Sequence, residues 1–169
     1  PVLIGPSLGG LLVQELVAEG FAMAAITLCT VAPNAMLAAD WSFLRNSAAI
    51  TNPMAGTAPY EMTPDDFHKN FANALDERTS AGAYEKFATH ESRQVLRDIM
   101  GREGKIEVES PHVPLLFIGA EKDEIIPTTL VMRNSEAYTD NRSHSEYMEF
   151  SARSHFIHCG PRWGEVAER

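Results

Sequence analysis

The sequence predicts an α/β fold built on a parallel sheet, and two stretches of the chain indicate it. Residues 2–4, 11–19 and 22–29 have the patterns of strand, helix and strand. Residues 114–119, 127–139 and 146–150 repeat that alternation near the other end of the chain. Neighbouring parallel strands need such a crossover, which is normally right-handed. We therefore expect about four parallel strands flanked by helices.

The first unit is well marked by its apolar spacing. Val2-Leu3-Ile4 is a short apolar run that ends at Gly5. Within 11–19 the apolar residues recur with helical spacing, and Gln14 and Glu15 lie opposite them. Gly20 is predicted to cap this helix. Residues 22–29 are apolar and β-branched enough to form a buried strand.

Residues 32–110 differ from the rest of the chain, since they are rich in alanine, methionine and aromatic residues and contain no convincing strand. One helix is predicted to begin at Thr63, which offers an N-cap followed by a proline and two acids in the first turn. Phe67, Phe71 and Leu75 continue it at four-residue spacing. Two more helices are expected over roughly 80–88 and 92–100, so this stretch is predicted to be a helical insertion.

The second unit begins with residues 114–119, a continuous apolar run typical of a parallel strand buried on both faces. A helix is expected at about 127–139 and a last strand at 146–150. Residues 164–169 have the pattern of the start of a final helix.

Composition limits the classes of partner. The chain has 169 residues, enough for one domain, and a formal net charge of −9. That charge disfavours nucleic acid and anionic membrane surfaces, and no apolar run approaches the roughly 18 residues of a membrane span. Two cysteines are too few for a disulfide framework. We expect a small-molecule partner; the compartment is left open, with the cytoplasm as the default expectation.

Residues 5–9, Gly-Pro-Ser-Leu-Gly, match the G-x-S-x-G pattern of a nucleophile elbow between a strand and a helix. Glycines on both sides leave room for the tight bend that presents Ser7. The helix directly behind directs its positive end toward developing negative charge, so the Leu8 N–H is predicted to be an oxyanion donor. The alternative is a Gly-Ser turn that starts an ordinary helix.

A nucleophilic serine needs a base and an acid that orients the base. Of six histidines, His155 follows the last strand at the sheet end where Ser7 lies, and His158 is its competitor. The loop after residues 114–119 offers Asp123, with Glu121 and Glu124 as alternatives that better fit a solvated loop. His155 and His158 have no further ligand cluster nearby in the sequence, so no metal is expected.

Together these motifs resemble the α/β-hydrolase family, most of all its capped, esterase-like bacterial members. The resemblance rests on Gly-Pro-Ser-Leu-Gly-Gly at 5–10, on Asp-Glu-Ile-Ile-Pro at 123–127 and on Ser-His-Phe at 154–156, in that order. It implies that residues 1–169 are the C-terminal part of one catalytic domain and that 32–110 are its helical cap. It also implies that Ser7 is the nucleophile, Asp123 the acid and His155 the base. The implied oxyanion donor is Leu8, and the implied elbow glycines are Gly5, Gly9 and Gly10.

Two departures from the family pattern matter. Position 6 is proline, where the family often has histidine. The family's first strands and its second oxyanion donor precede the elbow, whereas nothing precedes Pro1 in this sequence. We therefore expect the strand at 2–4 to have one exposed edge, which would invite pairing with another copy of the chain.

The resemblance implies a cofactor-free serine hydrolase that cleaves a small, mostly apolar ester, thioester or lactone through an acyl-enzyme. Apolar side chains of the insertion are expected to roof the pocket or to form the insertion's own core: Trp41, Phe43, Met54, Tyr60, Phe67 and Phe71. Two alternatives stay open. The same triad could serve acyl transfer, a lyase or a cofactor-free peroxidase, or the chain could be a non-catalytic binding module.

Overall fold

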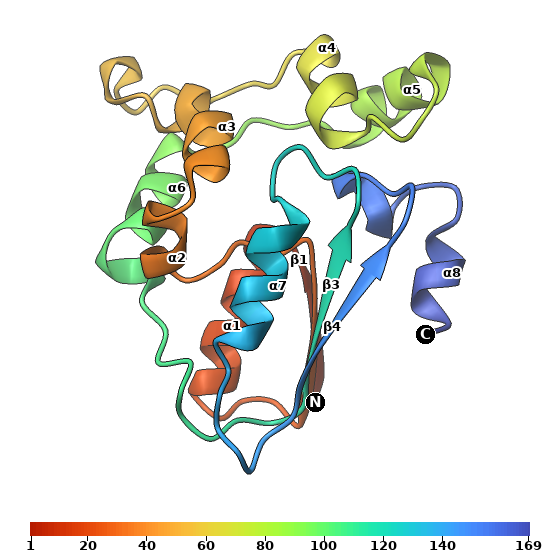
Figure 1. The fold of residues 1–169 in the computed structure, drawn as a ribbon. Helices are drawn as coiled ribbons and strands as arrows, with labels where there is room; N and C mark the ends of the chain where they lie inside the picture. Colours follow the sequence, from red (N-terminus) through yellow and green to blue (C-terminus); the bar gives the residue numbers. More distant parts are fainter.

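A computed structural model describes residues 1–169, apart from the side chains of Asn34 and Ala38. Its centre is a four-stranded parallel sheet in the order β1-β2-β3-β4, so the strands lie side by side in chain order (Figure 1). The predicted α/β class is confirmed. The strands are β1 (Val2–Pro6), β2 (Ala24–Leu28), β3 (Leu115–Ala120) and β4 (Ser145–Phe150).

The strand register brings four loops to one end of the sheet. Pro6 pairs with Leu28, Leu28 with Ile118, and Ile118 with Met148, so all four carboxyl ends are aligned. The residues that follow these strands therefore meet at one edge. Among the described residues β1 pairs only with β2.

Helices α1 (Leu8–Ala18) and α7 (Thr128–Glu136) cover one face of the sheet (Figure 1). The other face carries a smaller cluster that includes Ile118, Ile157 and Val166, the last from α8 (Trp163–Ala167). Val2 and Ile4 of β1 remain 61% and 64% exposed. The larger core lies between α1, α7 and the sheet, with these residues at its centre: Leu11, Val17, Ala25, Leu115, Phe117, Leu130 and Val131.

Gln14 departs from the predicted amphipathic pattern of α1, because it is fully buried instead of lying on a polar face. Its amide nitrogen donates to the carbonyl of Gly10, the hydroxyl of Thr30 and the carbonyl of Val31. Its amide oxygen accepts from the Tyr138 hydroxyl at 3.1 Å. A buried amide costs little when its hydrogen bonds are made, so Gln14 ties α1 to the segment after β2.

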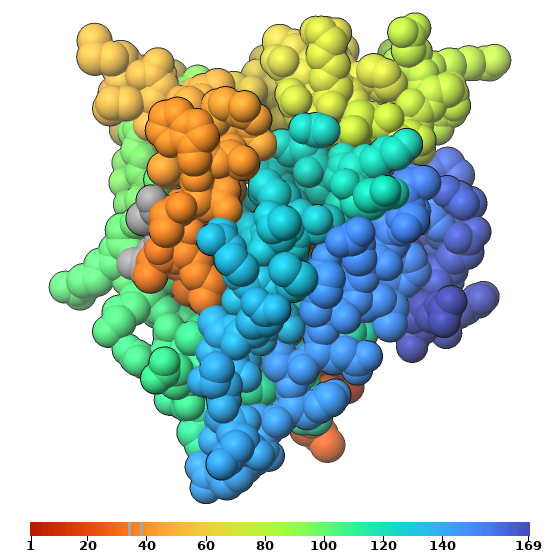
Figure 2. Space-filling model, in the orientation of Figure 1, coloured from red at the N-terminus to blue at the C-terminus, as the bar shows by residue number. Residues whose placement is uncertain are grey.

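Part of the helical insertion lies beyond the carboxyl ends of the strands, across the top of the molecule in Figure 2, and the rest lies beside α1 and α7, at the left of Figure 1. The predicted N-cap at Thr63 is confirmed, since its hydroxyl accepts from the Asp66 N–H at 3.1 Å. The elements are α2 (Asn34–Ala38), α3 (Trp41–Thr51), η1 (Pro53–Ala55), α4 (Pro64–Asp66), η2 (Phe67–Phe71), α5 (Glu77–Phe87), α6 (Arg93–Met100) and η3 (Arg102–Gly104).

The helix predicted from Thr63 onward is not a regular α-helix. After the single turn of α4, η2 is a π-helical turn, in which the Ala72 N–H donates to the Phe67 carbonyl at 2.8 Å. Packing accounts for the wider turn, because the rings of Phe67 and Phe71 stack at 5.1 Å and both contact Phe156. Such turns are frequent at functional sites.

No helix in the described part of the chain is long and apolar enough to span a membrane.

A smaller helix, η4 (His155–His158), follows β4 and carries the predicted histidine. It lies beneath η2, with which it is in contact.

Candidate active site

Ser7 occupies the sharp turn between β1 and α1 in a conformation that non-glycine residues rarely adopt, with φ 51° and ψ −122°. Backbone hydrogen bonds hold it there: its N–H donates to the Leu28 carbonyl at 2.9 Å, and its carbonyl accepts from the N–H groups of Gly10 and Val31. Its side chain does not cap α1. Strained residues of this kind cluster at functional sites, where surrounding contacts enforce them.

The neighbouring glycines are required for space. A β-carbon at Gly5 would lie 2.2 Å from the carbonyl oxygen of Gly9, and one at Gly10 would lie 2.3 Å from the Thr30 hydroxyl oxygen. A β-carbon at Gly9 would meet only the Pro6 ring, at 3.4 Å. Gly5 and Gly10 are thus needed for the close approach of β1, α1 and the segment after β2.

Leu8 is the first residue of α1, so its N–H has no acceptor within the helix. It follows Ser7 directly and lies at the positive end of an eleven-residue helix. An N–H in this position can donate to an anion that forms next to Ser7.

Asp123 and His155 form a buried hydrogen-bonded pair. Asp123 Oδ2 lies 2.7 Å from His155 Nδ1, and the two side chains are 0% and 1% exposed. Asp123 Oδ1 accepts from the N–H groups of Ile125 and Ile126, both at 2.8 Å. This network favours the imidazole tautomer with its proton on Nδ1.

With Nδ1 directed at Asp123, the second ring nitrogen of His155 is left as an acceptor. Nε2 is buried and has no hydrogen-bond partner among the described residues. The ring of Phe71 lies 4.8 Å from the imidazole, centroid to centroid. An orphaned Nε2 in an apolar surrounding can accept a proton from a hydroxyl group placed against it.

The rival acids lie elsewhere. Glu121 is exposed, and its carboxylate accepts from the Ala152 N–H at 2.6 Å. Glu124 is also exposed, and its backbone carbonyl accepts from the Asn46 side chain.

The rival base, His158, is not paired with a carboxylate in the described residues, and its Nδ1 is buried without a partner. Burial and the nearby His155 lower the pKa of His158. His90 and His144 meet glutamates only at the exposed surface.

Cys29 is a third member of the buried cluster, and sequence analysis missed it. Its sulfur, a carboxylate oxygen of Asp123 and a ring nitrogen of His155 all lie within 4.8 Å of one another. Its place directly after the second strand was the available signal, since side chains at the carboxyl ends of neighbouring strands meet. Burial and the Asp123 charge raise the pKa of the thiol well above its usual range, so without a bound metal ion this side chain is a neutral thiol.

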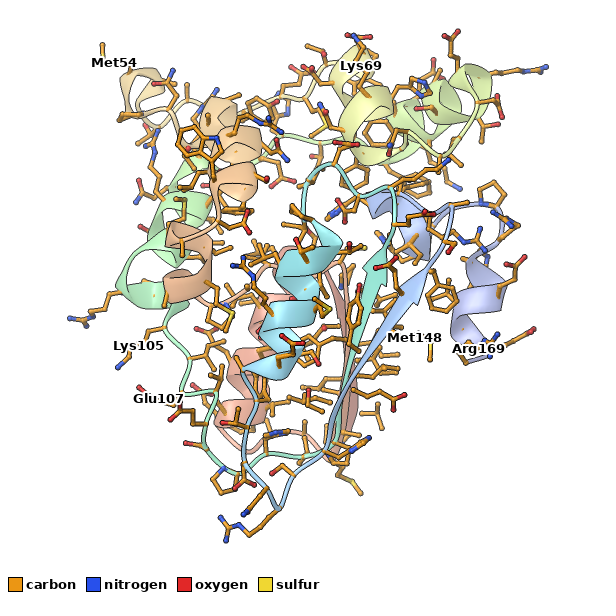
Figure 3. The ribbon with its side chains drawn as sticks, viewed as in Figure 1. Met54, Lys69, Lys105, Glu107, Met148 and Arg169 are labelled. Carbon is orange, nitrogen blue, oxygen red and sulfur yellow. The ribbon has the colours of Figure 1, made fainter. Side chains whose placement is uncertain are left out.

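The helical insertion touches this site at a few points. Besides the Phe71 ring, the Asn73 side chain donates to the Lys122 carbonyl at 3.0 Å in the loop before Asp123. Trp41 and Met54 are 77% and 91% exposed, and Figure 3 shows Met54 at the outer edge of the insertion. The expectation that these two roof a pocket is wrong. Phe43 is buried in the larger core.

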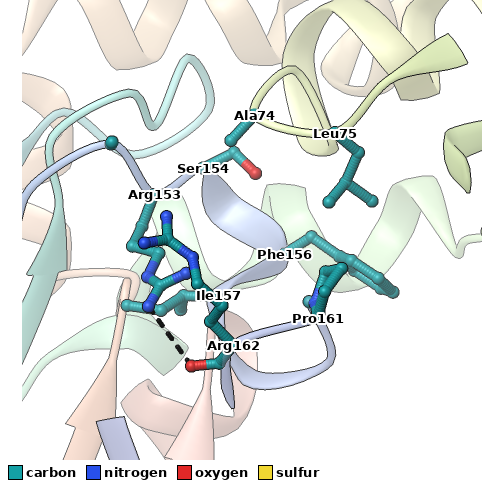
Figure 4. A pocket seen from close by; sticks show the side chains of 10 residues that line it. Ala74, Leu75, Arg153, Ser154, Phe156, Ile157, Pro161 and Arg162 are labelled. Atoms are coloured by element: carbon teal, nitrogen blue, oxygen red, sulfur yellow. Dashed lines mark hydrogen bonds between the residues drawn. The ribbon is translucent and has the colours of Figure 1, made fainter. Parts of the chain in front are cut away.

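Two shallow pockets lie where the insertion meets the loop after β4, and both are lined by Leu75, Phe156 and Pro161. Figure 4 shows the first, where Arg153 donates to the Arg162 carbonyl at 3.2 Å. Arg153 also pairs with Glu165 at 2.6 Å. Neither lining includes Ser7, Asp123 or His155.

Comparison with known proteins gives likeness in structure but not in sequence. No protein-family profile and no curated protein sequence matches the chain. A monoacylglycerol lipase from Paleococcus ferrophilus is similar over 100% of this chain and 65% of its own, with 22% identity and a TM-score of 0.65. A Mycobacterium tuberculosis protein, provisionally described as a non-heme bromoperoxidase, is similar over 99% of this chain and 64% of its own, with 16% identity and a TM-score of 0.67.

Tomato methylketone synthase I is similar over 99% of this chain and 68% of its own, with 13% identity and a TM-score of 0.65. The chain thus spans just under two thirds of the lipase and of the bromoperoxidase-like protein. At these identities the shared property is the fold.

Proposed function

The chain has the α/β-hydrolase fold, and from that premise we propose that it belongs to a serine hydrolase in which Ser7 is the nucleophile, His155 the base and Asp123 the orienting acid. The buried hydrogen bond between Asp123 and His155, at the sheet end where Ser7 is held in a strained turn, carries the proposal. These are the parts that acyl transfer through a serine requires.

In the proposed reaction the Ser7 hydroxyl attacks the carbonyl carbon of the substrate, and His155 Nε2 takes the hydroxyl proton. The carbonyl oxygen becomes an anion, toward which the Leu8 N–H donates. The imidazolium then gives its proton to the leaving group, which leaves an acyl-enzyme on Ser7. Water, deprotonated by His155, releases the acid and restores the serine.

Asp123 contributes by holding one tautomer of His155 and by stabilising the imidazolium. Its second oxygen is bound by two backbone N–H groups, so the carboxylate cannot rotate away. Such fixed dipoles need no reorganisation during the reaction.

We further propose that residues 1–169 are part of one catalytic domain and that residues 32–110 form its cap. The rings of Phe67, Phe71 and Phe156 cluster beside His155 and favour an apolar acyl or alcohol group. A small ester, thioester or lactone fits this chemistry, and a monoacylglycerol lipase is among the structural neighbours.

A second candidate keeps the serine but not hydrolysis. The bromoperoxidase-like protein and the methylketone synthase show that proteins with other assigned activities share this fold. Product analysis in water and with competing alcohol or amine acceptors separates hydrolysis from acyl transfer, lyase and peroxidase chemistry. A binding module without catalytic activity would convert no substrate in any of these assays.

A fluorophosphonate probe tests the proposal directly. We expect a single adduct on Ser7, located by mass spectrometry, and its loss in Ser7→Ala. Ser42→Ala is the matched control, because Ser42 is an exposed serine of the insertion. An adduct on another serine, or none in active protein, contradicts the assignment.

A further inference from the structure

Cys29 is a buried thiol that the proposed reaction does not use. It follows β2, with the elbow on one side and the loop of Asp123 on the other, and it is 1% exposed. Its φ of 46° lies in the left-handed region that disfavours a side chain. Its N–H donates to the Ile118 carbonyl at 2.7 Å. The fold therefore holds this side chain in a costly conformation.

The thiol meets the acid of the proposed triad. The Cys29 sulfur, a carboxylate oxygen of Asp123 and a ring nitrogen of His155 all lie within 4.8 Å of one another. Desolvation and the Asp123 charge raise the pKa of the thiol, which therefore remains protonated at neutral pH. A protonated thiol facing a carboxylate is a hydrogen-bond donor.

We propose that Cys29 is a positioning residue, whose S–H donates to Asp123 and thereby sets how strongly that carboxylate holds a proton on His155. The inference rests on the proposed function, since it assigns His155 as the base. Asp123 then accepts from the two backbone N–H groups, from His155 and from Cys29.

The direction of the effect follows from charge. A donor to the carboxylate withdraws negative charge that would otherwise stabilise the imidazolium. Removal of the S–H strengthens the attraction between Asp123 and protonated His155, so the pKa of His155 rises. A hydroxyl in place of the thiol is a stronger donor and lowers it.

The other groups around the pair stay constant in such variants. His158 follows on η4, where burial and the nearby His155 lower its pKa, and Tyr147 lies on β4, where burial raises its pKa. From the insertion, the uncharged ring of Phe71 faces the imidazole. The loop's own charges, on Glu121, Lys122 and Glu124, are exposed.

The experiment compares Cys29→Ala and Cys29→Ser with the wild type. The pH dependence of kcat/KM and the titration of the His155 ring nitrogens by NMR are both measured. We expect the acid limb to move up by about half a pH unit in the alanine variant, a threefold change in the protonation constant. It moves down by a similar amount in the serine variant. Cys159→Ser, at the exposed cysteine, is the matched control and leaves both readouts unchanged.

Shifts in the same direction for both variants, or none, overturn the inference. If Cys29→Ala does not fold, the downward shift in Cys29→Ser alone decides it. The NMR titration needs no turnover, so it distinguishes the two proposals. If no Ser7 adduct forms but the two variants shift the His155 titration in opposite directions, the proposed hydrolase function fails and the proposed role of Cys29 stands.

Discussion

The carboxyl end of the sheet and the helical insertion above it are built in different ways. At the sheet end, Ser7 is held by backbone hydrogen bonds from three neighbours, and Asp123 and His155 are buried. The insertion reaches the Asp123 loop by polar contacts such as those of Asn46 and Asn73, and it carries side chains as exposed as Met54. The difference indicates that the sheet end holds the side chains of the proposed triad firmly, while the insertion contacts them at only a few points.

The largest expected effect comes from the acid at the sheet end. Asp123→Asn should lower kcat by about 10⁴-fold, because the amide no longer stabilises the imidazolium and favours the wrong tautomer. Steady-state kinetics with an ester substrate measures it. Glu121→Gln and Glu124→Gln are matched controls on the same loop and should cost little. A large loss of activity in Glu121→Gln would show that Glu121, and not Asp123, is the acid.

His155→Ala should lower kcat as far as Ser7→Ala does, and the double variant should be no worse than either. Groups that act as one unit lose their effect together. Additive losses in the double variant would show that the two side chains act independently.

Gly5→Ala should lower stability by more than the ~1–3 kcal/mol typical of overpacking, because its new methyl meets the backbone of Gly9. Thermal unfolding measures this as a fall in Tm of about 2–4 °C per kcal/mol. Gly82→Ala in α5 is the control, since nothing lies within 4 Å of its β-carbon position. At that position the substitution should raise the free energy of unfolding by up to about 1 kcal/mol, because alanine favours a helix more than glycine does. Equal effects at both glycines would contradict the packing described for the turn at Ser7.

The smallest effects belong to the insertion. Phe71→Ala should lower kcat/KM about tenfold, mostly through KM, because it removes an apolar wall beside His155. Met54→Ala, at a side chain exposed to solvent, should change neither parameter. An effect on kcat alone would place Phe71 in the chemistry itself and weaken the contrast between the two regions.

Local patterns in the sequence predicted the features that depend on local physics. The apolar runs located the four strands to within a few residues, and the Thr63 cap was found from its own neighbours. The elbow motif located a strained Ser7. The sequence also singled out Asp123 and His155, which the structure brings within hydrogen-bond distance.

Features set by long-range contacts were not predictable in this way. The π-turn at Phe67–Phe71 depends on rings that pack against Phe156, about 90 residues later. Gln14 is buried because Thr30, Val31 and Tyr138 satisfy its amide. Cys29 comes close to Asp123 only when β2 lies beside β3.

The stepwise order of the strands has a topological consequence. Parallel crossovers are normally right-handed, so connections that advance across the sheet in one direction pass over the same face. The insertion obeys this, because Leu37 and Ile99 join the same core as α1 and α7. The opposite face beside β1, where Val2 and Ile4 are exposed, is therefore not covered by the connections between these strands. A segment that is not one of these crossovers, or another molecule, would have to cover it.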